Sequence, residues 1–153
     1  ITAANSSSIS DGAAALVLAR EAAAKASGLK PIARLRAQAS HARHPGEFTI
    51  APIGAIEKVL HQTGWSVDEV DLFEINEAFA MVPMLAMQEL GLSHDKVNIH
   101  GGACALGHPV GASGARIIVT LIYALQRLGK QRGIASLCIG GGEAVAVALE
   151  LID

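Results

Sequence analysis

The sequence predicts an α/β fold in which a mixed β-sheet is flanked by layers of helices. Strand-like apolar runs alternate with helical segments, and two apolar runs near the end, residues 134–139 and 144–151, are joined by three consecutive glycines. Such a pair is typical of an antiparallel hairpin, which we expect in or near the centre of the sheet. With 153 residues, the chain is long enough for about one domain with a sizeable core.

The composition agrees with this fold class and excludes some partners. Hydrophobic residues make up 51% of the chain but aromatic residues only 3%, so the core consists mainly of small aliphatic side chains. The 12 basic and 14 acidic residues are well mixed and give a net charge of −2, which argues against a nucleic-acid or membrane partner. The longest apolar stretch, residues 117–125, is too short to span a bilayer.

The N-terminal part of the chain is the least regular. Residues 13–19 form a run of small apolar side chains that fits either a buried strand or the start of a helix. A short helix is expected over residues 20–27, where Gly28 would end it. We expect a domain boundary near residues 28–31.

Helices and strands alternate through the rest of the chain, and glycine or proline marks most of their ends. Pro52 is placed to begin a helix that Gly64 stops. Residues 41–51 are expected to form a loop. The expected strands cover residues 32–39, 70–75 and 97–100, and the expected helices cover residues 52–63, 77–89 and 113–128.

A glycine-rich stretch, residues 101–116, carries the strongest functional signal. It reads GGACALGHPVGASGAR, and its five glycines and one proline leave no room for regular structure before the following helix. His108 precedes Pro109, so the restricted backbone helps to fix its direction. Its imidazole titrates near neutral pH and can take a proton from a thiol or donate a hydrogen bond to an oxyanion. The alternative is a tight turn with an incidental histidine, although ordinary turns need only one or two glycines.

Three other polar side chains are candidates for the same site. Cys138 ends a strand-like run shortly before three glycines, and a nearby imidazole or cluster of N–H groups can lower its ordinary pKa of about 8.5. Alternatively, Cys138 is a small buried hydrophobic residue. Asn76 can hold a water molecule or cap the helix expected after it. Glu77 either lies exposed in a first helical turn or, as we favour, braces the site.

We expect these side chains to converge. Asn76 follows one expected strand, His108 lies in the loop after the next, and Cys138 ends the strand after that. Ligands of open α/β sheets gather where strand ends and their loops meet. The sequence therefore predicts Asn76, His108 and Cys138 at one rim of the sheet, with His108 and Cys138 a few ångströms apart.

Three stretches resemble signature segments of the thiolases, the enzymes that make or cleave 3-ketoacyl-CoA by Claisen chemistry. They are the glycine-rich stretch, NEAFA at residues 76–80 and CIGGG at residues 138–142, and they occur in the family's order and at about its spacing. The resemblance covers essentially the whole chain. It implies a layered thiolase-like fold, with residues 1–28 as the tail end of an N-terminal domain and residues 29–153 as the C-terminal domain. It also favours a strand at residues 14–18.

The resemblance implies catalytic roles. A cysteine in the front half of a thiolase, outside this chain, is acylated by the first CoA thioester, and the histidine matching His108 activates it. The cysteine matching Cys138 removes the α-proton of acetyl-CoA, or protonates that carbon during cleavage. His108 and a water held by Asn76 would stabilise the enolate oxygen, while the N–H of Gly140 would serve a second oxyanion hole.

Four residues match positions near the CoA thioester, which is expected as a substrate; no tightly bound cofactor is expected. Ser7 matches a contact to the pantetheine arm, and Ala78 and Phe79 match positions lining the thioester pocket. Phe48 lies in a loop where short-chain biosynthetic thiolases commonly carry Met-Gly, so it bears on acyl-chain preference.

The implied function is that of the C-terminal part of an acetyl-CoA acetyltransferase, inactive alone because the acylated cysteine lies elsewhere. The alternatives are a degradative 3-ketoacyl-CoA thiolase of broader chain length and a non-catalytic folding or oligomerisation piece. Two cysteines without a secretory pattern favour the cytoplasm. The apolar excess indicates a buried interface, and a homodimer or homotetramer is expected for the full-length protein.

A metal site is the main rival interpretation of the same residues. His100, Cys104, His108 and Cys138 are soft potential ligands. The first three have helical spacing, but the glycines and the proline among them forbid that helix. The sequence therefore favours a site without a metal.

Overall fold

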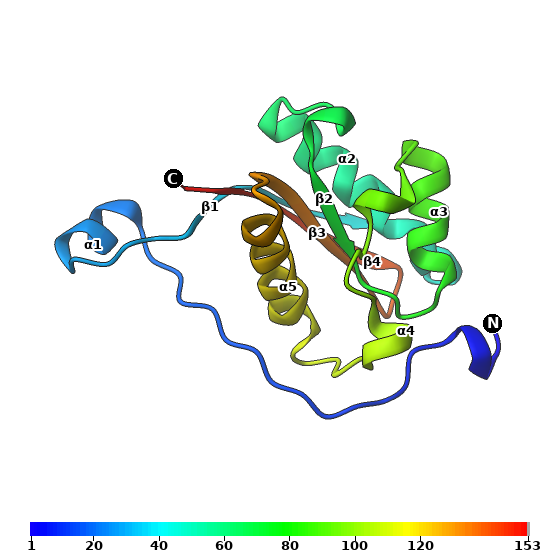
Figure 1. Cartoon of the computed structure of the whole chain (residues 1–153). Helices are drawn as coiled ribbons and strands as arrows, with labels where there is room; N and C mark the ends of the chain where they lie inside the picture. The colour runs from blue at the N-terminus through cyan, green and yellow to red at the C-terminus, as the bar shows by residue number, and fades with distance from the viewer. Residues whose placement is uncertain (153) are drawn as a thin grey trace.

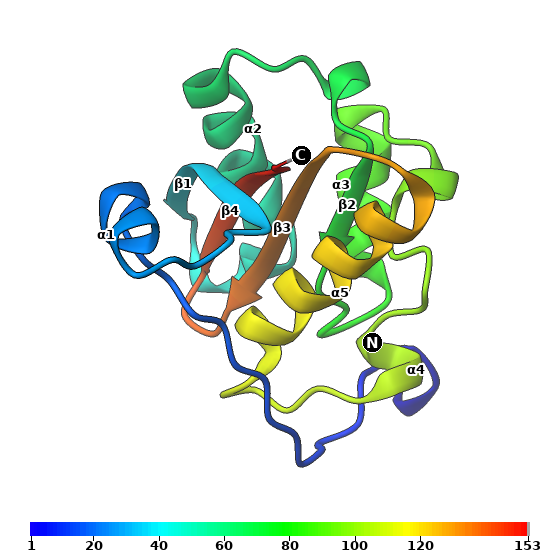
Figure 2. The same cartoon turned by 60° about the vertical axis from the view of Figure 1, so that its left-hand side comes forward.

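The computed structural model describes residues 1–152, which contain one four-stranded sheet in the order β1-β4-β3-β2. β1 (Ala33–Ala42), β4 (Glu143–Leu151) and β3 (Arg132–Ile139) are antiparallel neighbours, whereas β2 (Leu72–Ile75) pairs with β3 in parallel. The predicted mixed sheet is therefore confirmed, and the predicted hairpin of β3 and β4 forms its centre (Figure 2).

Helices cover both faces of this sheet. They are α1 (Glu21–Ala26), α2 (Ala51–Thr63), α3 (Met81–Leu90), α4 (Ala103–Leu106) and α5 (Ser113–Leu128). α2 and α3 lie on one face and α5 on the other (Figure 1). Because successive strand residues point to opposite faces, Ile134 packs in the core under α2, whereas Ala135 packs in the core under α5. The layered α/β fold is thus built on two cores.

The predicted glycine stop at Gly64 is confirmed, and two further helices end at a glycine in the same way. α2, α3 and α5 end at Gly64, Gly91 and Gly129, each with a positive φ that the left-handed C-terminal cap requires. The beginning of α3 differs from the expectation, because residues 77–80 are not helical. Their backbone instead meets the N-terminal segment, as Ala80 N–H donates to the carbonyl of Asn5 at 2.9 Å.

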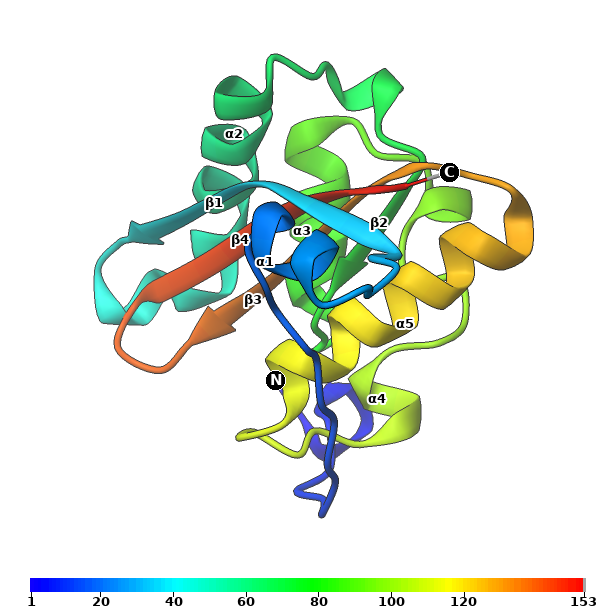
Figure 3. The same ribbon diagram turned by 90° about the vertical axis from the view of Figure 1, so that its left-hand side faces the viewer.

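The expected strand at residues 14–18 does not form. This segment has no regular structure and pairs with no strand among residues 1–152. A strand needs a neighbour to pair its backbone groups, and Val17 is 91% exposed and Leu18 71% exposed. The segment runs as an irregular connection to α1 (Figure 3).

The expected strand at residues 97–100 is reduced to a single bridge between Val97 and Phe73. Asn98 has a φ of 49°, a left-handed conformation that cannot continue a strand. Its side chain replaces the missing strand, because Oδ1 accepts from Ile75 N–H and Nδ2 donates to the Ile75 carbonyl, both at 2.8 Å. An amide side chain carries the same donor and acceptor as the backbone.

Two regions are more regular than the sequence predicts. The glycine-rich stretch contains the single turn α4, bounded by Gly102 and Gly107, because four residues between two glycines suffice for one turn. Residues 41–51 are not simply a loop, since β1 extends to Ala42 and a 3₁₀ helix follows at Pro45–Ile50. The imidazole of His44 caps this helix by accepting from Gly46 N–H at 3.2 Å.

The turn of the β3–β4 hairpin depends on Gly142. Its φ is +97°, and a Cβ at this position would overlap the carbonyl oxygen of Arg43. Its own carbonyl accepts from Arg43 N–H at 2.8 Å, which ties the turn to the end of β1. The backbone here therefore has room only for glycine.

We expect Gly142→Ala to lower the free energy of unfolding by about 2 kcal/mol, because it combines an unfavourable φ with a steric overlap. Urea denaturation followed by circular dichroism measures the change. Gly114→Ala is the matched control, since Gly114 lies in α5 with no atom within 4 Å of an added Cβ. Equal losses in the two variants would contradict this account of the turn.

Candidate active site

Two of the three predicted side chains meet at one edge of the sheet. Asn76 directly follows β2, is 1% exposed, and is held by its N–H donating to the Ser136 carbonyl at 2.9 Å. Asn76 Nδ2 lies 3.3 Å from His108 Nε2, within hydrogen-bond distance. The convergence of Asn76 and His108 is thus observed directly.

His108 is half-buried, and its second ring nitrogen is also engaged. Nδ1 lies 2.6 Å from the hydroxyl of Ser113, the first residue of α5. Burial and then the positive charge of Arg116 lower the pKa of His108. The imidazole is therefore neutral at neutral pH, the form that can accept a proton.

Cys138 lies at the same edge, one strand further. β2 and β3 are parallel, and Ile75 pairs with Ser136, so Asn76 and Cys138 both lie at the carboxyl ends of their strands. Cys138 is 8% exposed and belongs to the core under α2. Within residues 1–152 it forms no hydrogen bond with His108, and the approach of the two side chains stays a prediction.

Burial changes the acidity expected for Cys138. The sequence suggested that a nearby imidazole or N–H cluster lowers its pKa, but desolvation instead raises the pKa of this thiol. A hydrogen bond from its own backbone acts in the lowering direction and is outweighed. Cys138 therefore keeps its proton at neutral pH. Gly140 follows in the exposed hairpin turn, with open space where a side chain would be.

The four residues predicted to lie near the thioester form two contacting pairs. The N–H and hydroxyl of Ser7 both donate to the carbonyl of Ala78, at 3.2 and 3.0 Å. Phe48 and Phe79 stack edge to face, with ring centroids 5.8 Å apart. Ser7 is therefore held against the loop after β2, although its segment has little regular structure.

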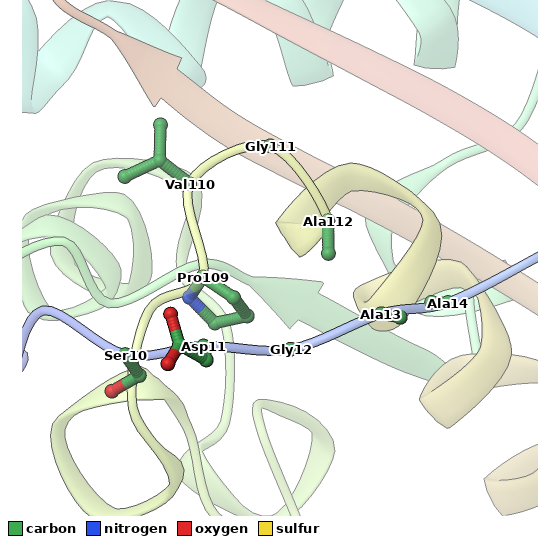
Figure 4. Close-up of a pocket in the computed structure, with 9 residues that line it drawn as sticks. All are labelled: Ser10, Asp11, Gly12, Ala13, Ala14, Pro109, Val110, Gly111 and Ala112. Carbon is green, nitrogen blue, oxygen red and sulfur yellow. The ribbon is translucent and has the colours of Figure 1, made fainter.

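The N-terminal segment, residues 1–14, contacts both the loop after β2 and the glycine-rich stretch. Ser6 forms a β-bridge with Phe79, and Ile9 forms one with His108. The backbone N–H of His108 donates to the carbonyl of Ser8 at 3.1 Å. An open hollow of about 400 Å³ lies further along this contact, between residues 10–14 and residues 109–112 (Figure 4). The segment thus borders the loop that carries His108.

Glu77 braces the site, as favoured from the sequence. Its carboxylate accepts from Asn98 Nδ2 and from the N–H of Cys104, both at 3.1 Å. A Cβ at Gly102 would overlap this carboxylate and displace it from these hydrogen bonds. Glu77 therefore ties the loop after β2 to the glycine-rich stretch.

Sequence reasoning missed three residues beneath the site. The sequence predicts only that Ser113 begins a helix, and it assigns no role to Arg116 or Glu74. Arg116 Nη2 donates to Asn76 Oδ1 at 3.4 Å, and Arg116 Nη1 lies 3.6 Å from the carboxylate of Glu74. A charged residue within the apolar run of β2 was the one available signal.

Glu74 is an ionisable group of the core. It is 2% exposed, and burial raises its pKa to about 7 despite the nearby Arg116. The Nη1 contact is an ion pair longer than a hydrogen bond, and Arg116 Nε and Nη1 make no hydrogen bond among residues 1–152. The pair is therefore incompletely compensated.

Within residues 1–152, no group of three or more His, Cys, Asp or Glu side chains is arranged to hold a metal ion. Of the helices in this part of the chain, none has the length and apolarity needed to cross a bilayer.

In this layered α/β domain, the loop that carries Asn76 meets the loop that carries His108 at the edge of the sheet. This arrangement is that of the thiolases. Residues 29–151 match the family model described as Thiolase, C-terminal domain, and the chain belongs to this family. It is 51% identical to a cytosolic acetyl-CoA acetyltransferase of Mus musculus over 98% of the chain, and 48% identical to the acetyl-CoA acetyltransferase of Escherichia coli over 100%. It spans 38% and 39% of their respective lengths.

Two solved structures share the fold. The acetyl-CoA acetyltransferase of Bacillus anthracis superposes with a TM-score of 0.96 at 46% identity, and a thiolase of Ascaris suum in complex with coenzyme A with 0.89 at 41%. Each comparison covers 99% of this chain and 39% of the other.

The raised pKa of Glu74 predicts a pH-dependent stability. A carboxyl whose pKa is raised from 4.5 to about 7 stabilises the fold below its unfolded pKa, and this contribution is lost as the pH rises through about 7. The free energy of unfolding should fall by on the order of 3 kcal/mol between about pH 4.5 and 7 from this residue. Glu74→Gln should remove the fall, whereas Glu89→Gln at an exposed position should keep it. Urea titrations across the pH range measure both, and an unchanged fall in Glu74→Gln would refute the assignment.

Proposed function

We propose that this chain supplies the acid–base part of an acetyl-CoA acetyltransferase site, which transfers acyl groups between CoA thioesters by Claisen condensation or thiolytic cleavage. The observation that carries the proposal is the contact between Asn76 Nδ2 and His108 Nε2. It joins two motifs from separate loops at the carboxyl edge of the sheet, where ligands of such sheets bind. The family and the names of the relatives support the same activity.

His108 acts as the base that activates the acylated cysteine supplied from outside this chain. Its lowered pKa keeps the ring neutral and able to accept the thiol proton. Asn76, which cannot titrate, holds a water that stabilises the enolate oxygen together with His108, and the N–H of Gly140 serves the second oxyanion hole.

Cys138 exchanges the proton at the α-carbon. Its raised pKa keeps the thiol protonated at rest, the correct form for protonating the carbon during thiolysis. The thiolate left by that step can then take the proton of the incoming CoA thiol. In condensation the same sulfur must first lose its proton, so the buried position has opposite consequences for the two directions.

The CoA thioester binds along the N-terminal segment and the loop after β2. Ser7 contacts the pantetheine arm, and Ala78 and Phe79 line the thioester pocket. Phe48 packs edge to face on Phe79, so it borders the proposed thioester pocket and bears on acyl-chain preference. The cytosolic relative supports a location in the cytoplasm. A homodimer or homotetramer without a tightly bound cofactor is what the family resemblance implies for the full-length protein.

A hybrid enzyme tests the proposal. The chain is fused in place of the matching C-terminal part of the Escherichia coli relative, and thiolysis of acetoacetyl-CoA and condensation of acetyl-CoA are measured. The hybrid should be active, and the 153-residue chain alone should be inactive because it lacks the acylated cysteine. A folded hybrid without either activity would indicate a non-catalytic folding or oligomerisation piece. Activity mainly on longer 3-ketoacyl-CoA would indicate the degradative type.

In the active hybrid, Cys138→Ser should abolish carbon–carbon bond formation, because a serine hydroxyl is too weak an acid–base group at neutral pH. Acylation of the other cysteine should persist in part. Single-turnover labelling with acetyl-CoA and a condensation assay separate the two steps. Full condensation activity would exclude the role given to Cys138.

Replacing His108 by Ala should impair both half-reactions, since it serves nucleophile activation and an oxyanion hole. Asn76→Ala loses only a water-mediated hydrogen bond and should cost less, on the order of a hundredfold in kcat. The same labelling and turnover assays apply. Normal acyl-enzyme formation in His108→Ala would show that another group activates the nucleophile.

A further inference from the structure

We propose that Ser113 and Arg116 are positioning residues that set the tautomer of His108, with the proton on Nδ1 and the lone pair on Nε2. The geometry is a chain of hydrogen bonds from Arg116 through Asn76, His108 and Ser113 to the carbonyl of Pro109. The catalytic value of this tautomer rests on the proposed function, but the tautomer itself does not.

The Arg116 end of this hydrogen-bond chain can only donate. A guanidinium has N–H donors and no acceptor, so the Asn76 atom 3.4 Å from Arg116 Nη2 must be the amide oxygen. The Nδ2 amide group then faces the imidazole at 3.3 Å and donates to it. His108 Nε2 must therefore accept, which places its lone pair toward Asn76.

The hydrogen-bond chain ends at the carbonyl of Pro109, which can only accept. The Ser113 hydroxyl donates its single proton to the carbonyl of Pro109 at 3.0 Å. With its proton given to this carbonyl, its oxygen can accept from His108 Nδ1, at 2.6 Å. Because a neutral imidazole carries one N–H, the proton required at Nδ1 agrees with the lone pair required at Nε2. The Asn76 end requires this tautomer, and with it the Ser113 end keeps both of its hydrogen bonds.

The two positioning residues are held by the rigid part of the fold. Ser113 is fully buried, and Arg116 lies three residues later in the first turn of α5, where residues three apart share a helix face. Arg116 is also paired with the buried Glu74 of β2. The loop that carries His108 is therefore oriented by a helix and a strand rather than by its own backbone alone.

This arrangement has a chemical consequence. The Nε2 lone pair is the atom that can take a proton, and after protonation both ring nitrogens are donors. The Asn76 amide then faces a donor and must release the ring, which frees it to hold a water. Proton uptake by His108 and the availability of Asn76 are thereby linked.

Nitrogen NMR of the chain tests the tautomer without any activity. In uniformly ¹⁵N-labelled protein, the two ring nitrogens have distinct shifts when protonated and unprotonated, and the His108 signals are assigned by their absence from His108→Gln. We expect the Nδ1–H tautomer at neutral pH. Ser113→Ala should shift the ring toward the Nε2–H tautomer, whereas Ser113→Thr keeps the hydroxyl and should retain Nδ1–H.

Ser136→Ala is the matched control, because Ser136 is also fully buried and its hydroxyl donates to the Val145 carbonyl. It should leave the His108 signals unchanged. If Ser113→Ala does not fold, Ser113→Cys, with a weak acceptor of similar size, takes its place. An Nε2–H tautomer in the unmodified chain, or signals in Ser113→Ala identical to those of the unmodified chain, would overturn the proposal.

Arg116→Met tests the donor end, since it removes the guanidinium that fixes the Asn76 amide. A mixture of His108 tautomers is expected, and a pure Nδ1–H signal would overturn the role of Arg116. In the hybrid enzyme, Ser113→Ala should lower kcat by about tenfold or more with little change in KM, and Ser113→Thr should restore it. An inactive hybrid with the Nδ1–H tautomer would reject only the proposed function.

Discussion

The structure of the site depends on the parallel pairing of β2 with β3. Ile75 lies opposite Ser136, and the Asn76 N–H donates to the Ser136 carbonyl, which fixes where the loop after β2 leaves the sheet. A shift of one residue would turn Asn76 to the other face and move every β2 side chain from one core to the other. All four residues of β2 are buried, so this register is specified from both faces of the sheet. The edge at which Asn76 and Cys138 lie is therefore determined by core packing.

The same helix serves the core and the site. α5 packs Leu121 and Leu125 against the sheet, and its first turn presents Ser113 and Arg116 to the motif loops. Substitutions that shift α5 therefore reach His108, even where they touch no substrate. Near the start of the glycine-rich stretch, the carboxylate of Glu77 accepts from the N–H of Cys104. The part of the glycine-rich stretch that precedes α5 and carries His108 is consequently fixed at both of its ends, although most of its residues have no regular structure.

Elements with strong local signals could be predicted from the sequence. The α5 helix and the β3–β4 hairpin have apolar patterns and glycine boundaries, and both are observed near their expected limits. Residues 14–18 and 97–100 could not be predicted correctly, because the outcome depends on partners distant in sequence. The first run has no strand to pair with among residues 1–152, and Asn98 replaces a strand with its side chain. For the site, residue types indicated His108 and Asn76, but the supporting roles of Ser113 and Arg116 appear only in three dimensions.

Burial explains the electrostatics of the site as a whole. It lowers the pKa of His108 and raises the pKa of Cys138 and Glu74, so each of the three groups is moved toward its neutral form. Arg116 is the permanently charged member of this group, and it lies next to Asn76, the residue proposed to hold water at the enolate oxygen. A negative charge that develops in such surroundings gains more from one fixed cation than it would in water. In the Claisen reaction that we propose for this site, the charge that develops is that of the enolate, so the neutral resting state and the partly buried cation act in the same direction.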